Sequence, residues 1–232
     1  MDFDGPKVLA PLNDKPMLHW VIESVQKAGI SDVVVVVGHR AAEVEESLEG
    51  HWVKVKVAHQ AEQLGTANAV MAGMPFVPDD ARTVLIANGD KPLMTPKTFA
   101  KLVHIQQQTA AAAVLSVSHV EDPSRYGYGR VVRDGKGRVQ KIIEQKVLSP
   151  EESAITECNA GSVAHDAQWL RDALAKVQQS KTGEYYLTEL VDIAYQENER
   201  IEVVEITDPA EAHGVNTMEH LDQAHHFLEA SN

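Results

Sequence analysis

Two short segments contain residues whose types and spacing suit nucleotide chemistry. Gln60 and Gln63 lie on a loop that reaches Gly65 before a predicted helix, so their amides could meet the hydrogen-bonding edge of uracil or a similar base. Asp90 directly follows an apolar strand, and one carboxylate completed by phosphate oxygens and water suits Mg²⁺. Together the segments predict a site for a nucleobase and a divalent metal. Solvated glutamines and a capped turn are the alternative interpretations.

Other polar residues stand at the ends of predicted elements. Asn216 offers a second oxygen ahead of the last helix, where it could equally be a helix cap. Lys7 and Arg130 are candidate phosphate or sugar contacts, or simply surface cations. Glu144 closes one strand and Asn159 opens another, positions from which both could bind sugar hydroxyls.

The segment at residues 183–188 combines two aromatic residues with a hydroxyl. Tyr185 and Tyr186 precede a predicted helix and offer a surface on which a sugar could stack, while Thr188 provides a hydroxyl for a phosphate. Both tyrosines could instead belong to the core.

Several other chemistries lack their usual patterns. The C-terminal histidines have neither H-E-x-x-H spacing nor accompanying cysteines, which disfavours a zinc site; they are His213, His220, His225 and His226. Cys158 has no activating neighbour in the sequence, and no G-x-S-x-G elbow is present. The sequence therefore does not favour a hydrolase with a protein nucleophile.

Composition and charge restrict the partners. The 232 residues are 44% hydrophobic and 24% charged, which is ordinary for a globular protein, and the net charge of −13 disfavours polymeric nucleic acid and anionic membranes. A single cysteine, no signal-peptide pattern and no long apolar run predict a cytoplasmic protein. We expect one domain over residues 1–232.

Apolar patterns predict alternating strands and helices. A run of five valines at residues 33–37 indicates a strand buried on both faces, as in a parallel sheet. Further strands are expected at residues 53–57, 83–87, 111–118, 161–164 and 201–204. Helices are expected at residues 17–28, 41–48, 66–74, 166–177, 187–195 and 217–228, and another begins at Thr95-Pro96. This alternation predicts a doubly wound, mostly parallel α/β fold.

One part of the chain departs from this pattern. Residues 130–133 and 138–143 are joined by an Asp-Gly-Lys-Gly turn, which is a strong hairpin signal. We expect an antiparallel, substrate-binding insertion here.

Eight segments, in order along nearly the whole chain, resemble the uridylyltransferase domain of bacterial N-acetylglucosamine-1-phosphate uridylyltransferase. Each motif is weak alone, but their order and spacing make the resemblance strong. The segments are residues 6–9, 60–69, 88–93, 127–130, 144–146, 157–161, 183–188 and 214–216.

The resemblance implies transfer of UMP from UTP to N-acetylglucosamine 1-phosphate, giving UDP-N-acetylglucosamine and pyrophosphate. It implies that Asp90 and Asn216 hold Mg²⁺ and that Lys7 contacts phosphate, with Lys7 and Asp90 as the catalytic residues. The residues implied for the uracil nucleotide are Lys7, Gln60, Gln63, Gly65 and Thr66. Those implied for the sugar phosphate are Gly129, Glu144, Asn159, Tyr186 and Thr188. Positioning and charge neutralisation carry most of such a reaction.

Three departures from the family pattern stand out. The family opens with a strand and a glycine-rich loop that cradles the triphosphate, whereas Met1 stands where that loop's last residue would be. A misplaced start codon is our leading explanation. The absence of that strand should expose the apolar flanks of the neighbouring strands. Asn88 and Lys91 replace the usual aromatic and small residues, so Lys91 could neutralise pyrophosphate or an acidic sugar, or displace the metal. No β-helix repeats follow Asn216, so no trimer is implied.

Two alternatives to this enzyme remain open. One is a nucleotide-sugar-binding or regulatory protein that has lost catalysis. The other is a nucleotidyltransferase for another base or sugar phosphate, and base competition separates it from the first hypothesis.

Overall fold

The computed structural model describes residues 3–50 and 55–230. Its strands are β1 (Pro11–Leu12), β2 (Lys15–Pro16), β3 (Val33–Val37), β4 (Val55–His59), β5 (Thr83–Ile86), β6 (Ala113–His119), β7 (Arg130–Arg133), β8 (Val139–Ile143), β9 (Glu157–Asp166) and β10 (Ile201–Glu205). Its α-helices are α1 (Met17–Lys27), α2 (Ala41–Leu48), α3 (Thr66–Gly73), α4 (Pro96–Thr109), α5 (Ala167–Leu174), α6 (Glu189–Gln196), α7 (Pro209–Ala212) and α8 (Met218–Ala230). None of the helices in these two ranges has the length and apolar character that crossing a bilayer requires.

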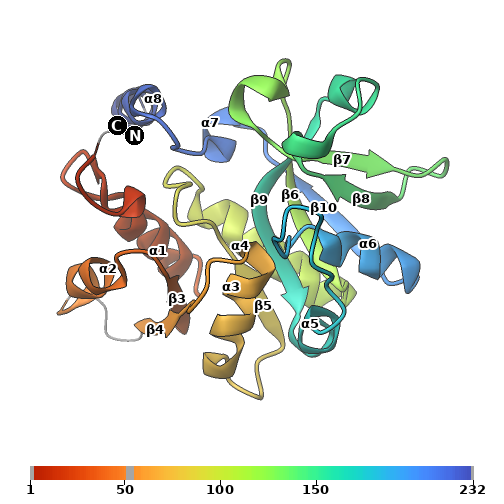
Figure 1. Ribbon diagram of the computed structural model, residues 1–232, viewed down its shortest axis with the longest axis horizontal. Helices are drawn as coiled ribbons and strands as arrows, with labels where there is room; N and C mark the ends of the chain where they lie inside the picture. The colour runs from red at the N-terminus through yellow and green to blue at the C-terminus, as the bar shows by residue number, and fades with distance from the viewer. Residues whose placement is uncertain (1–2, 51–54, 231–232) are drawn as a thin grey trace.

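β9 is the organising strand of a six-stranded sheet. One of its edges pairs antiparallel with β6, which in turn pairs parallel with β10. The other edge pairs with β5 along residues 163–166 and with β7 at Cys158. β5, β6 and β10 therefore run in one direction, and the β7–β8 hairpin extends the sheet at the far end from β3 and β4 (Figure 1). The predicted α/β fold with an antiparallel insertion is confirmed.

β9 is longer than the predicted strand at residues 161–164, because an irregularity interrupts its apolar pattern. Gly161 has a positive φ of +92°, and the register with β6 shifts between Leu115 and Val117. The Ser116 hydroxyl bridges the shift: it donates to the Ser162 carbonyl at 2.7 Å and accepts from the Ser162 amide at 3.0 Å. The two halves of β9 can thus pair with different strands on one edge.

Helices cover both faces of the sheet, as the doubly wound prediction requires. On one face, α1 and α4 pack on sheet residues including Val114, Ala164 and Val204. On the other, α3, α5 and α6 pack on Val84 and Ile86. The alternation of side chains along each strand delivers neighbouring residues to opposite faces.

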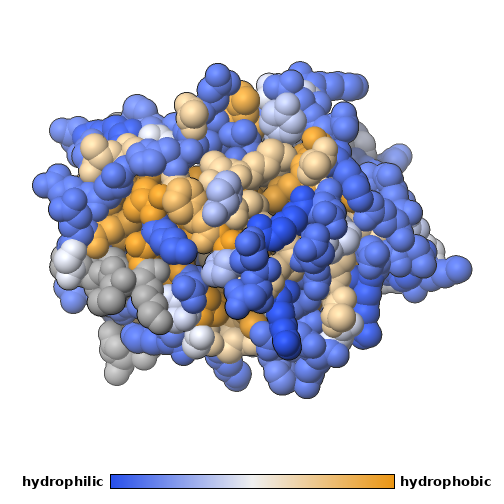
Figure 2. Space-filling model, turned by 90° about the horizontal axis from the view of Figure 1, so that it is seen from below, coloured by the Kyte–Doolittle hydropathy of each residue, from blue (hydrophilic) through white to orange (hydrophobic). Residues whose placement is uncertain are grey.

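β3 and β4 form a separate parallel pair. In the described part of the chain β3 pairs only with β4 and β5 only with β9, and a groove of about 900 Å³ lies between β3 and β5. Val33–36 are only half-buried, so the prediction that β3 is buried on both faces is wrong, because one side of the strand borders this groove. The expected apolar flanks are present, and Figure 2 shows apolar side chains exposed among polar ones on the underside of the molecule.

Most predicted elements exist, and their ends differ by a few residues. The predicted strand at residues 53–57 lies partly outside the described residues, and β4 is assigned from Val55 to His59. Two short elements were not predicted: the β1–β2 hairpin and the one-turn helix α7, which begins with Asp208 accepting from the Ala210 amide. Elements this short have no apolar periodicity to reveal them.

Candidate functional site

Asp90 lies in the turn that follows β5, at the carboxyl end of that strand. The preceding residue, Gly89, packs closely on the core: a Cβ atom there would lie 3.4 Å from Val8 and 3.5 Å from Leu18. These are ordinary van der Waals distances, so the turn rests directly on Val8 and Leu18. The sheet and α1 therefore fix the position of the Asp90 carboxylate, whose side chain remains 24% exposed.

Two other segments bring polar side chains to Asp90. The Lys7 ammonium lies 2.6 Å from Asp90 Oδ2 and 2.8 Å from Asn216 Oδ1. Lys7 begins a 3-10 turn (Lys7–Leu9), and the Val215 amide donates to the Asp90 carbonyl at 2.9 Å. Residues far apart in sequence are thus held at one point.

The oxygens at this point form a donor set that suits Mg²⁺. Asp90 contributes a carboxylate and Asn216 an amide oxygen, and both already converge on one positive charge, the Lys7 ammonium. Hard divalent cations take such oxygen ligands and complete their shell with water and phosphate. Across residues 3–50 and 55–230, no cluster of three or more His, Cys, Asp or Glu side chains is placed to hold a metal.

Two cavities meet at Asp90. A pocket of about 240 Å³ has among its lining residues the sugar candidates Gly129, Glu144, Asn159 and Thr188. The carboxyl end of the groove between β3 and β5 is bordered by the nucleotide candidates Lys7, Gln60 and Thr66. Asp90, Thr66, Asn88 and Leu187 border both cavities. The arrangement can place two ligands side by side with a cation between them.

A matching family model is "Nucleotidyl transferase", which covers residues 3–227. The chain belongs to the nucleotidyl transferase family. It is 40% identical over 224 residues to the bifunctional protein GlmU of Pelotomaculum thermopropionicum, covering 96% of this chain and 48% of that protein. Against the Enterococcus faecalis GlmU the identity is 37% over 223 residues, with the same coverage. The chain thus spans about half the length of these relatives.

Solved structures of low sequence identity share the fold. A UDP-glucose pyrophosphorylase complexed with UDP-glucose superposes with a TM-score of 0.78 at 13% identity, covering 98% of this chain and 91% of that one. A 4-diphosphocytidyl-2C-methyl-D-erythritol synthase from Anaerococcus prevotii gives 0.70 at 14% identity, with 97% and 94% coverage. Both comparisons show that the chain has the same fold as these two structures.

Hydrogen bonds hold the sugar candidates in place. The Thr188 hydroxyl donates to Glu144 Oε1 at 2.8 Å, which joins the start of α6 to the end of β8. Asn159 accepts from the Gly161 amide through its side chain at 3.0 Å and donates its own amide to the Gly129 carbonyl at 2.9 Å. Asn159 therefore lies inside β9 rather than opening a strand.

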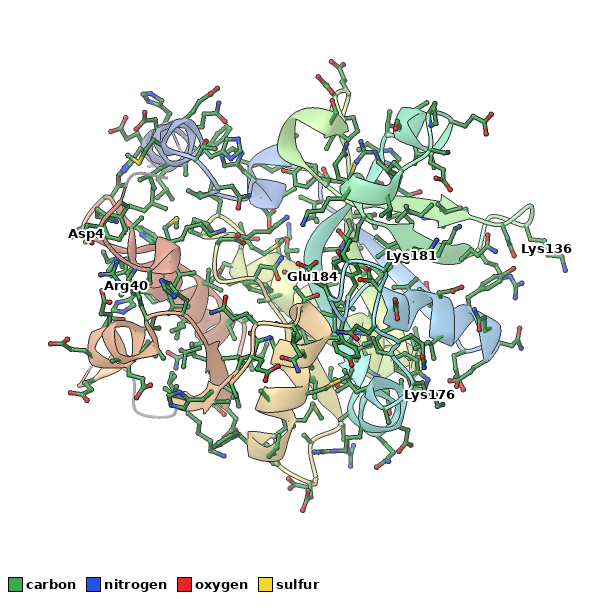
Figure 3. All side chains as sticks on the ribbon, in the orientation of Figure 1. Asp4, Arg40, Lys136, Lys176, Lys181 and Glu184 are labelled. Carbon is green, nitrogen blue, oxygen red and sulfur yellow. The ribbon has the colours of Figure 1, made fainter. Side chains whose placement is uncertain are left out.

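The loop at residues 60–65, which carries most of the nucleotide candidates, is stabilised by its own amide groups. Gln60 Nε2 donates to the Gly65 carbonyl at 3.0 Å and to Asn68 Oδ1 at 2.8 Å. Gly65 has φ +102°, and a Cβ atom there would lie 2.5 Å from the Tyr185 carbonyl oxygen, so a side chain would not fit. Gln63 lies against Gly38 instead. The loop is held close to the segment between α5 and α6, on which Figure 3 labels Lys181 and Glu184.

Not every candidate lines the pocket. Tyr186 exchanges a hydrogen bond with Thr182 at 2.9 Å and is not among the pocket residues. Arg130 is fully buried in β7 and donates to the Tyr128 carbonyl, so its interpretation as a surface cation is wrong. Cys158 is buried as well, and burial raises the pKa of its thiol, which disfavours a nucleophile.

The Lys91 ammonium is engaged by backbone carbonyls and not by Asp90 or Asn216. Its ammonium donates to the carbonyls of Ala160 at 2.7 Å and Ala212 at 3.0 Å, and lies 4.9 Å from the centre of the Tyr128 ring. Burial lowers the pKa of Lys91 to about 8, although the neighbouring Asp90 acts in the opposite direction. Lys91 thus joins β9 to α7 in the wall of the pocket of about 240 Å³, and its ammonium does not occupy the position between Asp90 and Asn216.

Sequence reasoning missed Tyr128 as a pocket residue. Its ring lines the pocket and its hydroxyl donates to the Ala212 carbonyl at 3.0 Å. The only signal in the sequence was its place between Gly127 and Gly129, and Gly129 was the residue chosen as a sugar candidate there.

Proposed function

We propose that this nucleotidyl transferase moves UMP from UTP to N-acetylglucosamine 1-phosphate, with Mg²⁺, and forms UDP-N-acetylglucosamine and pyrophosphate. One observation carries the proposal: Asp90 borders two cavities, one with the nucleotide candidates and the other with the sugar candidates. Relatives named GlmU agree with this substrate choice, and the chain covers 48% of their length.

The reaction needs positioning more than a protein nucleophile. A phosphate oxygen of the sugar 1-phosphate forms a bond to the α-phosphorus of UTP, and the bond from that phosphorus to the bridging oxygen breaks as pyrophosphate leaves. The attacking phosphate is already anionic, so no side chain has to remove a proton. Alignment of the two substrates and neutralisation of their charges supply the rate increase.

The residues divide these tasks. Asp90 and Asn216 would hold Mg²⁺, which supplies neutralisation of the phosphate charge when bound. Lys7 binds a phosphate oxygen at the groove. The uracil nucleotide is held by Gln60, Gln63, Gly65 and Thr66, and the sugar phosphate by Gly129, Glu144, Asn159 and Thr188.

The test is pyrophosphate release by the 232-residue chain from UTP and N-acetylglucosamine 1-phosphate, with and without Mg²⁺. CTP and glucose 1-phosphate replace each substrate in turn. Turnover with UTP and the acetylated sugar above the other pairs supports the proposal. Binding of UDP-N-acetylglucosamine without turnover favours the regulatory alternative, and preference for CTP favours another base.

Glu144→Gln is expected to raise the KM for the sugar phosphate about fivefold to tenfold, because a hydrogen bond to a charged acceptor is worth roughly 1 kcal/mol more than one to a neutral acceptor. The glutamine keeps an acceptor for Thr188, whose hydroxyl lies 2.8 Å from Glu144, but loses the negative charge that favours sugar hydroxyls. Steady-state kinetics with each substrate varied separately measures the effect. Glu205→Gln, on the exposed end of β10, is the matched control, and an unchanged sugar KM contradicts the assignment.

Gln60→Ala is expected to raise the KM for UTP about tenfold and to lower the free energy of unfolding by about 1 kcal/mol. The substitution removes two hydrogen bonds that brace the loop, at 3.0 and 2.8 Å. Urea unfolding and UTP titration give the two values. Gln107→Ala removes an exposed amide of α4 and should change neither; a sugar KM that rises as much as the UTP KM speaks against a nucleotide role.

A further inference from the structure

The Lys7 ammonium donates hydrogen bonds to both candidate metal ligands, so it would compete with a metal for them. Its ammonium lies 2.6 Å from Asp90 Oδ2 and 2.8 Å from Asn216 Oδ1, the two oxygens that converge at the carboxyl end of β5. An ammonium is a compact cation with three donors and no acceptor. The position that suits Mg²⁺ is therefore filled by a cation belonging to the chain itself.

We propose that Lys7 acts as a displaceable internal cation: it neutralises Asp90 until a divalent metal takes its place, and the released ammonium then binds a nucleotide phosphate. The inference rests on the proposed function, because it assigns the metal to Asp90 and Asn216. It goes further by making metal binding a competition with a side chain.

The geometry makes the two cations compete for the same oxygens. Mg²⁺ binds oxygen at about 2.1 Å, so a metal on Asp90 Oδ2 would lie within about 5 Å of an ammonium still bound to that oxygen, where like charges repel. Asn216 Oδ1 is engaged by the same ammonium at 2.8 Å. The metal gains both oxygens only when Lys7 leaves them.

The Lys7 ammonium has space to move from Asp90 towards the groove. Its side chain is 37% exposed, and it borders the groove on which the other nucleotide candidates lie. The backbone that carries it is fixed, since the Ala10 amide donates to the Lys7 carbonyl at 3.1 Å and Ala10 is fully buried. Rotation of the flexible stem can therefore move the ammonium from the carboxylate to a phosphate without moving the chain.

Removal of Lys7 should consequently have effects of opposite sign on metal and nucleotide. Lys7→Met is expected to bind Mn²⁺ about threefold to tenfold more tightly than the unaltered protein, the scale of a partly exposed ion pair. The same variant should bind UTP more weakly when the metal is bound, because it lacks the ammonium that the metal releases for the phosphate. A merely structural lysine would not produce this inversion.

The experiment is titration of the full 232-residue chain with Mn²⁺, followed by electron paramagnetic resonance of the free ion, alongside calorimetric titration with UTP. Lys7→Arg keeps the charge and should not show the gain in Mn²⁺ affinity. Lys136→Met removes an exposed lysine at the tip of the β7–β8 hairpin (Figure 3) and should match the unaltered protein. Lys7→Gln is the second neutral variant if the methionine variant folds poorly.

The outcomes separate the two proposals. Asp90→Asn should weaken Mn²⁺ binding at least about tenfold, as expected on loss of the only charged ligand of the pair. If it does so while the neutral Lys7 variants bind Mn²⁺ no more tightly than the unaltered protein, the displacement is wrong and the metal site stands. If Asp90→Asn binds Mn²⁺ unchanged, the metal assignment fails and the displacement fails with it.

Discussion

Asp90→Asn is expected to lower Mg²⁺-dependent turnover about a thousandfold, a change in activation free energy of about 4 kcal/mol. Asp90 is the only carboxylate in the group that it forms with Lys7 and Asn216. An asparagine keeps the shape and one oxygen but removes the charge that would hold a metal at the shared edge of the two cavities. The measurement is kcat for pyrophosphate release over a range of Mg²⁺ concentrations.

A stability measurement separates this effect from damage to the fold. The Lys7–Asp90 pair is partly exposed, at 37% and 24%, so its loss should change the free energy of unfolding by less than about 1 kcal/mol. Asp222→Asn, on the exposed side of α8, removes a negative charge away from the site and should leave turnover unchanged. A decrease of less than tenfold in the Asp90 variant, with unchanged Mg²⁺ dependence, would remove Asp90 from the metal site.

The position of Asp90 could be predicted from sequence, whereas its contacts could not. An apolar strand followed by Asn-Gly-Asp places a carboxylate at the ligand-binding edge of an α/β sheet. The contacts that Lys7 makes with Asp90 and with Asn216 join residues separated by 83 and 209 positions along the chain. No local periodicity encodes such distances, and only the family resemblance suggested that these side chains act together.

The burial of two charged residues could not be predicted from the sequence either. Lysine and arginine usually lie at the surface of a protein, yet Lys91 is 8% exposed and Arg130 is fully buried. Lys91 is satisfied by the carbonyls of Ala160 and Ala212, which come together only once β9 bends and α7 packs beside it. Helix and strand patterns predict elements well, but they do not show which backbone carbonyls the folded chain leaves available.

β9 and β3 show the same limit at the level of the sheet. The sequence predicted both strands, because their apolar residues form recognisable runs. It did not predict that β9 would extend to ten residues around the irregular register at Gly161, since a register shift depends on the partner strand. For β3, the run of valines indicated burial, but exposure along the groove is set by which strands lie beside it.

His165 should make the protein markedly less stable in acid. Its ring is 1% exposed, stacks on Trp169 and lies 2.9 Å from the Ala112 carbonyl oxygen through Nδ1. Burial lowers the pKa of His165 to about 4, against an ordinary value of 6.5. Between these values the unfolded chain binds a proton that the folded protein does not, so the stabilisation is complete above pH 6.5 and is lost as the pH falls towards 4.

The expected size of this loss is about 3 kcal/mol in the free energy of unfolding. Urea unfolding at several pH values from 7.5 to 4.5 measures it, with His165→Gln as the variant, because glutamine can still donate to the Ala112 carbonyl but does not titrate. The variant should lose about 2 to 3 kcal/mol less than the unaltered protein over this range. His104→Gln, on an exposed position of α4, should retain the full pH dependence. Equal losses in all three proteins would mean that His165 is protonated in the folded state, which its burial against Ala112 and Trp169 opposes.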